Sequence, residues 1–176
     1  MVDVEIDLAQ PSMLVELAAF ARATYAHAFG HEIGQVMLEQ HLVDNMSNEQ
    51  FEQMMCGDAF YLARAEGRLV GFAQLGEVSL SYRPYLLALD DKDWELRRLY
   101  VHADVQSMGI GSRLIGRVLS EPDIMASSNL YLTTWETNHG AQKLYQKHGF
   151  EKVGQIPEYD ERGNLNGYEH IMRRKN

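Results

Sequence analysis

Residues 96–115 are the stretch that most constrains the fold of this chain. The first six of these residues are rich in apolar and β-prone side chains, which predicts a strand. A polar linker and two glycines, Gly109 and Gly111, come next. The apolar residues that follow are spaced by single helical turns, at Leu114, Ile115, Val118 and Leu119. The stretch therefore predicts a strand, a glycine-bearing turn and a helix.

A turn of this kind places a row of backbone N–H groups at the start of a helix. The first four of them have no partner within the helix, and the helix dipole adds partial positive charge there. Glycine lets a phosphate approach the backbone where a Cβ would block it. A plain strand-to-helix turn needs only one glycine, so the pair by itself is typical of a phosphate site or of an ordinary turn.

The residues around the glycines favour the first interpretation. The pattern Gln106-x-x-Gly109-x-Gly111 resembles the acetyl-coenzyme A signature of the GNAT N-acetyltransferases, and it is neither a P-loop nor a dinucleotide fingerprint. The resemblance implies acetyl-CoA as co-substrate. It also implies that the end of the strand bonds the pantetheine arm and that the loop holds the pyrophosphate. The implied binding residues are Leu99, Tyr100 and Val101 in the strand, and Gln106, Ser107, Met108, Gly109, Ile110, Gly111 and Ser112 in the loop.

Residues 138–150 resemble a second GNAT motif, Asn-x-x-Ala-x-x-Phe/Leu-Tyr-x-x-x-Gly-Phe. Asn138 and Tyr145 are seven residues apart, about two helical turns, and so share a face of the expected helix. The resemblance implies that Asn138 bonds the pantetheine arm and that Tyr145 places its hydroxyl near the coenzyme sulfur. Taken alone, the two residues are equally typical of a helix cap and a core tyrosine.

The order of expected elements predicts an α/β fold with a mixed sheet. Strands are expected over residues 2–8, 60–65, 69–75, from 95 to the linker, and over 129–134, 150–156 and 168–173. Helices are expected over 11–30, 32–44, 47–57, 111–120 and 138–149, with Pro122 ending the fourth and a loop over 79–93. The resemblance implies the GNAT-type fold, a mostly antiparallel central sheet flanked by helices.

Length and composition favour a single domain over residues 1–176, since 45% hydrophobic residues can form one sizeable core. The resemblance divides it into an acceptor-side half (1–94), an acetyl-CoA-binding core (95–150) and C-terminal strands (151–176). A net charge of −9 argues against nucleic-acid and anionic-membrane partners. With neither a membrane span nor a signal segment in the sequence, we expect a cytoplasmic protein. The single Cys56 cannot form an internal disulfide and is expected to be a structural thiol.

Acidic residues are concentrated in two segments. No lysine or arginine lies between Arg22 and Arg64, where several acids fall, and a second cluster joins Asp90, Asp91, Asp93 and Glu95. These acids either form solvated surfaces or steer a positively charged substrate. Residues 25–57, 60–63, 71–73, 135–138 and 170–172 resemble small bacterial GNAT enzymes related to polyamine acetyltransferases, which favours a polyamine as the amine substrate.

The resemblance implies direct acetyl transfer in a ternary complex. A lysine-like amine has a pKa of about 10.4, so a base must remove its proton near neutral pH. Glu95 is the candidate base, the alternative being the last acid of an exposed loop. Tyr145 is the candidate acid for the leaving thiolate, and a backbone N–H near Leu99 or Tyr100 would stabilise the developing oxyanion.

The identity of the acceptor and the alternative of a non-catalytic module stay open at this point. The acceptor is a polyamine, a protein N-terminus or an amino-acid-like molecule, and a non-catalytic acetyl-CoA sensor would carry the same coenzyme motifs. The C-terminal strands of such folds often pair across an interface, so a homodimer is expected by analogy. No metal site is expected, because Gly30 interrupts the helix that would align His27 with His31.

Overall fold

The computed structural model describes residues 3–31, 34–78, 84–86, 89–90, 92–160 and 162–176. The chain divides into two compact units, Met1–Gln74 with Arg98–Arg117, and Leu75–Arg97 with Val118–Asn176. The expected loop over 79–93 and the start of the second expected helix, at 32–33, lie partly outside the described residues. No helix among the described residues has the length and apolar character to cross a membrane.

Among the described residues, seven strands form a sheet in the order β1-β2-β3-β4-β5-β7-β6. Their bounds are β1 Val4–Leu8, β2 Ala59–Ala65, β3 Arg68–Glu77, β4 Trp94–Val101, β5 Asn129–Trp135, β6 Glu151–Tyr159 and β7 Leu165–Lys175. The pairs β1/β2, β5/β7 and β6/β7 are antiparallel, and β4/β5 is parallel. This confirms the predicted α/β fold with a mixed, mostly antiparallel sheet flanked by helices.

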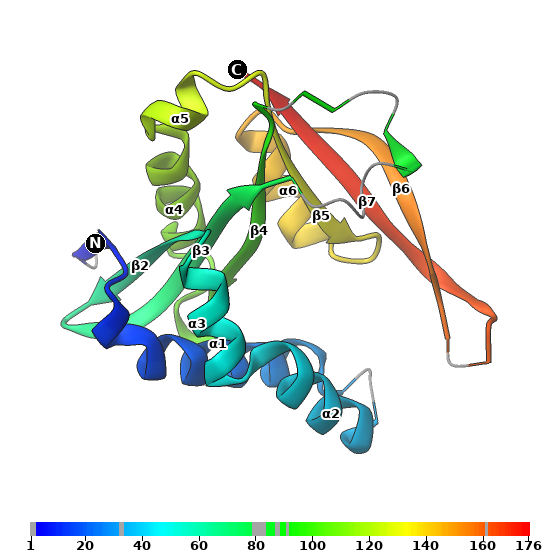
Figure 1. The fold of residues 1–176 in the computed structure, drawn as a ribbon, viewed down its shortest axis with the longest axis horizontal. Coiled ribbons are helices and arrows are strands. Elements are labelled where there is room, and N and C mark those ends of the chain that lie inside the picture. Colours follow the sequence, from blue (N-terminus) through cyan, green and yellow to red (C-terminus); the bar gives the residue numbers. More distant parts are fainter. Residues whose placement is uncertain (1–2, 32–33, 79–83, 87–88, 91, 161) are drawn as a thin grey trace. The chain divides into compact units, whose positions relative to one another are not determined.

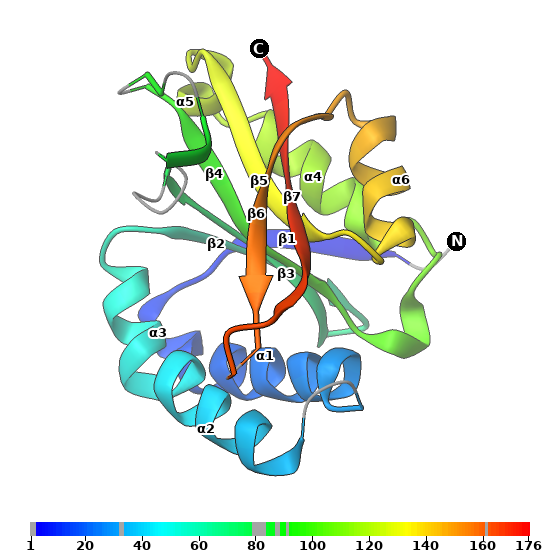
Figure 2. The same ribbon diagram turned by 90° about the vertical axis from the view of Figure 1, so that its right-hand side faces the viewer.

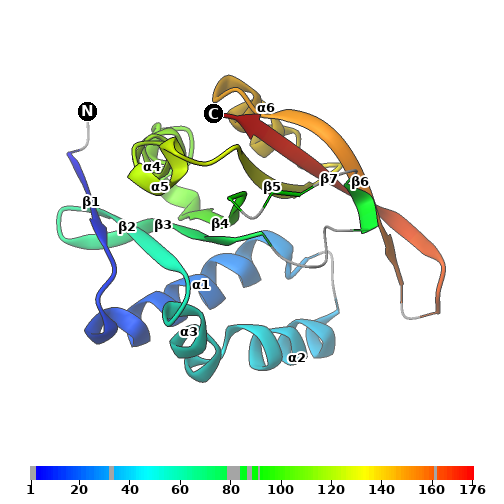
Figure 3. The same cartoon turned by 45° about the horizontal axis from the view of Figure 1, so that its top comes forward.

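In the first unit, helices cover both faces of the strands. After the 3₁₀ turn Pro11–Met13, helices α1 (Leu14–Phe29), α2 (Gln35–Met46) and α3 (Asn48–Met55) pack on one face of β2 and β3 (Figures 1 and 3). The core between them is formed by Leu17, Ala18, Ala21, Met46, Phe51, Phe60, Leu62, Leu69 and Phe72. Tyr61 alternates with Phe60 and Leu62 and faces the other side, where Arg117 of α4 (Ile110–Leu119) lies over its ring at 4.9 Å.

Local side-chain chemistry explains where several of these elements begin. Ser47 accepts a hydrogen bond of 3.2 Å from the Gln50 N–H and caps α3, as the Ser-x-x-Gln pattern predicts. Glu66 and Gly67 form the short turn between β2 and β3. The helix expected from residue 32 begins instead at Gln35, directly after Gly34.

In the second unit, β5, β7 and β6 lie side by side, and helix α6 (His139–Lys147) follows β5 (Figure 2). Tyr131 and Ile171 form a small core with the partly buried Val78, Leu86, Leu89, Val153 and Ile156. Both C-terminal strands extend beyond the expected ranges, because their antiparallel ladder continues to the pair Tyr159 and Leu165.

Two helix ends show detail that the sequence did not predict. Helix α4 ends at Leu119, before Pro122, as expected. Pro122 also begins the short helix α5 (Pro122–Met125), since proline is well suited to the first turn of a helix. Cys56 is exposed at the end of α3, where its Sγ lies 3.4 Å from the Glu52 carbonyl oxygen, and its role as a structural thiol stays a prediction.

Candidate active site

The glycine-bearing loop lies in the first unit, between the end of β4 and the start of α4. The 3₁₀ turn Ala103–Val105 leads into it, and the Gln106 side chain donates a hydrogen bond of 3.2 Å to the Val101 carbonyl oxygen. Ser107 and Gly109 both have positive φ, 64° and 85°. These contacts and the two left-handed residues turn the chain sharply into the helix.

The loop leaves backbone donors available at the start of α4. The Arg113 N–H donates to the Gly109 carbonyl oxygen at 3.0 Å, so the N–H groups of Ile110, Gly111 and Ser112 come before the first hydrogen bond within the helix. A Cβ built on Gly109 would meet no atom within 4 Å. The loop therefore combines open space at Gly109 with N–H groups that have no partner within the helix and with the positive end of a helix dipole, which fits a phosphate group.

Tyr100, in the strand before the loop, packs its side chain into the core. Leu99, Tyr100 and Val101 are all half-buried. The Tyr100 ring packs edge-on against Phe72, with 5.2 Å between centroids. Burial raises the pKa of Tyr100, and the charge and hydrogen bonding of Arg98 oppose that rise. Because the side chain belongs to the core, a ligand would meet this part of β4 through its backbone.

The second predicted motif lies in the other unit, on and before α6. Asn138 is the N-cap of α6, and its Oδ1 accepts a hydrogen bond of 3.1 Å from the Ala141 N–H. Tyr145 is 8% exposed, and its ring packs edge-on against Phe150 at 6.0 Å. Asn138 thus makes the predicted cap, and Tyr145 lies at the surface of the core rather than deep within it.

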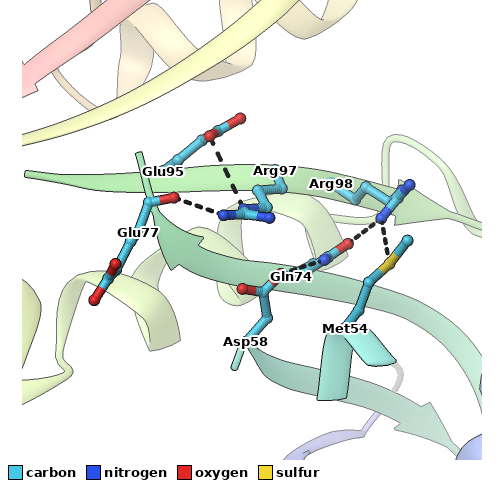
Figure 4. Close-up of polar contacts among 7 residues, drawn as sticks. All are labelled: Met54, Asp58, Gln74, Glu77, Glu95, Arg97 and Arg98. Carbon is cyan, nitrogen blue, oxygen red and sulfur yellow. Dashed lines mark hydrogen bonds and ion pairs between the residues drawn. The ribbon is translucent and has the colours of Figure 1, made fainter. Parts of the chain in front are cut away.

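Glu95 belongs to β4 and is buried. Only 7% of the residue is exposed, and its register partner in the parallel strand β5 is Tyr131. The Arg97 Nε lies 3.9 Å from the Glu95 carboxylate, while Arg97 Nη2 donates a 2.7 Å hydrogen bond to the Glu77 carbonyl oxygen (Figure 4). The alternative interpretation, an acid on an exposed loop, was wrong for Glu95.

The other acids of its cluster differ from Glu95. Asp93 is 4% exposed and accepts hydrogen bonds of 2.8 Å from the Asn129 side chain and from the Asp90 N–H. It therefore supports the loop structurally. Asp91 lies outside the described residues.

Comparison with known proteins decides the family. Residues 20–150 match the model of the Acetyltransferase (GNAT) family. The chain belongs to this family. It is an acetyl-CoA-dependent N-acetyltransferase, as the sequence motifs predict.

The relatives of this GNAT chain are moderately similar to it. It is 28% identical over 141 residues to an uncharacterized N-acetyltransferase of Mycobacterium bovis, covering 79% of this chain and 83% of the relative. It is 30% identical over 111 residues to the N-acetylaspartate synthetase of Danio rerio, covering 63% of this chain and 36% of that protein. Among solved structures, the PaiA N-acetyltransferase of Thermoplasma acidophilum in complex with coenzyme A has the same fold, with a TM-score of 0.75, 19% identity and 99% of each chain covered.

Two acidic residues of this GNAT enzyme could not be identified from the sequence. The strand register places Glu158 and Glu169 on the same face of their strands as Thr133 and Glu95. Glu169 is half-buried, and burial, Glu158 and Glu95 together raise the pKa of its carboxyl against a hydrogen bond with Thr133 that lowers it. The alternation of side chains along β7 places Glu169 on the same face as Glu95 only when the neighbouring strands are known.

A second group that the sequence analysis missed lies in the first unit of this GNAT enzyme. The Arg98 guanidinium donates a hydrogen bond to Gln74 Oε1, and Gln74 Nε2 donates one of 2.6 Å to the Asp58 carboxylate (Figure 4). Arg98 and Gln74 are separated by 24 residues. No spacing in the sequence marks this pair, because it depends on how β3 and β4 lie in the fold.

Proposed function

We propose that the enzyme acetylates a primary amine by direct attack in a ternary complex, with Glu95 as the proton acceptor. Acetyl-CoA supplies the acetyl thioester. An amine with a pKa of about 10.4 is almost fully protonated near neutral pH, and its nitrogen must lose a proton to become a nucleophile. The observation that carries this proposal is the burial of Glu95, a carboxylate on a strand, which is typical of a functional rather than a solvated acid.

The proposed roles on the coenzyme side are divided between backbone and side chains. The backbone of Leu99, Tyr100 and Val101 would bond the pantetheine arm like an added strand, and residues 106–112 would hold the pyrophosphate. Asn138 would bond the pantetheine arm as well. Tyr145 would donate its hydroxyl proton to the departing thiolate, a modest requirement because a thiol has a pKa of only about 8.5. The open space at Gly109 and the cap made by Asn138 support these roles.

A polyamine is the first candidate acceptor. The net charge of −9 and the shared strand face of Glu95, Glu158 and Glu169 support an acceptor with several positive charges. Glu169 responds to the charges of Glu95 and Glu158, so the three carboxylates act on one region.

An amino-acid-like amine is the second candidate acceptor, and the half-buried Arg98 favours it. The name of one relative, N-acetylaspartate synthetase, also denotes a product that carries carboxylates. A protein N-terminus, a homodimer and a cytoplasmic location stay predictions from the sequence.

The experiment that tests the proposal measures thiol release from acetyl-CoA with spermidine, amino acids and short peptides as acceptors. We expect amine-dependent release, and we expect Glu95→Gln to lower kcat/KM by about 10²- to 10⁴-fold at pH 7. Glu66→Gln, in the turn between β2 and β3, is the matched control and should retain activity. If Glu95→Gln is as active as the wild type at every pH, Glu95 is not the proton acceptor.

A further inference from the structure

Arg98 is an arginine whose direct contacts are neutral groups. Its Nη1 donates hydrogen bonds to Gln74 Oε1 and, at 3.1 Å, to Met54 Sδ. Its guanidinium carbon lies 5.8 Å from the centre of the Phe51 ring. Gln74, which is fully buried, links Arg98 to the carboxylate of Asp58.

Other arginines of the described residues form direct ion pairs with carboxylates. Arg64 pairs with Glu16 at 2.5 Å, and Arg173 pairs with Glu151 at 3.0 Å. Within the described residues, Arg98 belongs to no ion pair of this kind. A partly desolvated charge without a direct counter-charge is unfavourable, so Arg98 is held where an anion would be stabilised.

The neighbours of Arg98 respond to its positive charge. His41 of α2 stacks on Tyr25 of α1, with 4.4 Å between ring centroids and 9° between planes. Burial lowers the pKa of His41, the charge of Arg98 lowers it further, and Asp44 opposes both. Arg98 also opposes the rise in the pKa of Tyr100. The charge of Arg98 therefore acts on both side chains.

The guanidinium has donors to spare. It carries five N–H groups in a planar fork that matches a carboxylate. The hydrogen bonds to Gln74 and Met54 leave from Nη1, and a further hydrogen bond joins Arg98 to the Tyr100 side chain, so two N–H groups remain. Arg98 is half-buried, so part of the group remains accessible. The fully buried Phe51 ring closes its inner side.

We infer that Arg98, with Met54 beside it, binds a carboxylate carried by the acceptor, which makes the acceptor an amino-acid-like amine. The inference rests on the proposed function. It concerns the acceptor and not the coenzyme, because these residues lie on the face of the first unit that α1, α2 and α3 cover. The loop at the start of α4 belongs to the helix on the opposite face.

The test uses acceptors that differ only in the carboxylate. Each amino acid is compared with its amide and with the amine that lacks the carboxyl group, for example lysine with 1,5-diaminopentane. We expect the enzyme to acetylate at least one amino acid with a kcat/KM about 10- to 100-fold above that of its amide, the range typical of hydrogen bonds between charged groups.

Variants then assign the preference to Arg98. Arg98→Gln should abolish the ratio between acid and amide while the KM for acetyl-CoA is unchanged, and Arg98→Lys should retain part of it, since lysine keeps the charge without the fork. Arg64→Gln removes the same charge at a surface ion pair and should keep the full ratio. A merely structural Arg98 would lower the melting temperature without changing the ratio. An unchanged ratio in Arg98→Gln, or turnover of polyamines alone, overturns the inference.

A binding measurement separates this inference from the proposed function. If no acceptor is acetylated, the proposed function fails, and the Arg98 subsite is examined with N-acetyl amino acids and their amides in the presence of coenzyme A. A bound carboxylate should neutralise Arg98 and raise the pKa of His41, followed by nuclear magnetic resonance, in the wild type and not in Arg98→Gln. If no carboxylate in the series changes the titration of His41, the inference is wrong.

Discussion

The side-chain oxygen of Asn138 accepts a hydrogen bond of 3.1 Å from the backbone N–H of Ala141, and this bond caps helix α6. The cap uses the oxygen of the carboxamide. A bond to the pantetheine arm can therefore use the NH₂ group, so the structural role and the proposed binding role fall on different atoms of one side chain.

We expect Asn138→Asp and Asn138→Ala to separate the two roles. Aspartate keeps the capping oxygen, so stability should be retained, but it loses the donor, and the KM for acetyl-CoA should rise about 3- to 10-fold. Alanine loses both, and the free energy of unfolding should also fall by about 1 kcal/mol. Thermal unfolding and steady-state kinetics measure the two effects.

The control is Ser47→Ala, which removes the cap of α3. It should lower stability by a similar amount and leave the KM for acetyl-CoA unchanged. If Asn138→Asp has the wild-type KM for acetyl-CoA, the NH₂ group of Asn138 does not bind the pantetheine arm.

Tyr145→Phe tests the proposed acid. Phenylalanine keeps the ring that packs against Phe150, so the fold should be retained. We expect kcat to fall about 10-fold, less than for many general acids, because a thiolate is a good leaving group. Tyr159→Phe, at an exposed tyrosine of β6, is the matched control. Full activity of Tyr145→Phe over the whole pH range would assign the proton to another donor.

Local signals explain why much of the fold could be predicted. The caps made by Ser47 and Asn138 and the turn at Glu66 and Gly67 depend on residues within three or four positions, which a sequence displays directly. A family motif singles out Asn138 and Tyr145, and the position of Glu95 at the start of the central strand makes it the candidate base. The start of α2 was less predictable, because no capping side chain marks Gly34.

Contacts between distant residues explain what the sequence could not show. Glu169 comes under the influence of Glu95 and Glu158 only through the pairing of β5 with β7 and of β7 with β6. Arg98 reaches Met54 across 44 residues and Gln74 across 24. Neither carboxylate clustering nor an arginine without a carboxylate partner follows from periodicity, because both depend on strand neighbours.

Glu169→Gln should change how stability depends on pH. Burial and the neighbouring acids raise the pKa of Glu169 in the folded state, so between the unfolded and the folded pKa the native protein binds more protons than the unfolded chain. The contribution of Glu169 to stability is therefore full below the unfolded pKa and is lost as pH rises through the folded pKa. Glutamine does not titrate. The melting temperature of the variant minus that of the wild type should therefore be larger at pH 8 than at pH 4. An equal difference at both pH values would contradict the raised pKa.

Gly109→Ala tests the coenzyme loop against a matched glycine elsewhere. Gly109 and Gly163 have similar positive φ values, 85° and 79°, and a Cβ would meet no atom within 4 Å at either position. Alanine should therefore lower the free energy of unfolding by about 1–2 kcal/mol at both, through backbone strain alone. Only Gly109→Ala places a methyl group on the proposed phosphate site, so only this variant should raise the KM for acetyl-CoA, by about 10-fold or more, with the acceptor KM unchanged. Equal coenzyme KM values in the two variants would mean that the phosphate does not approach the backbone at Gly109.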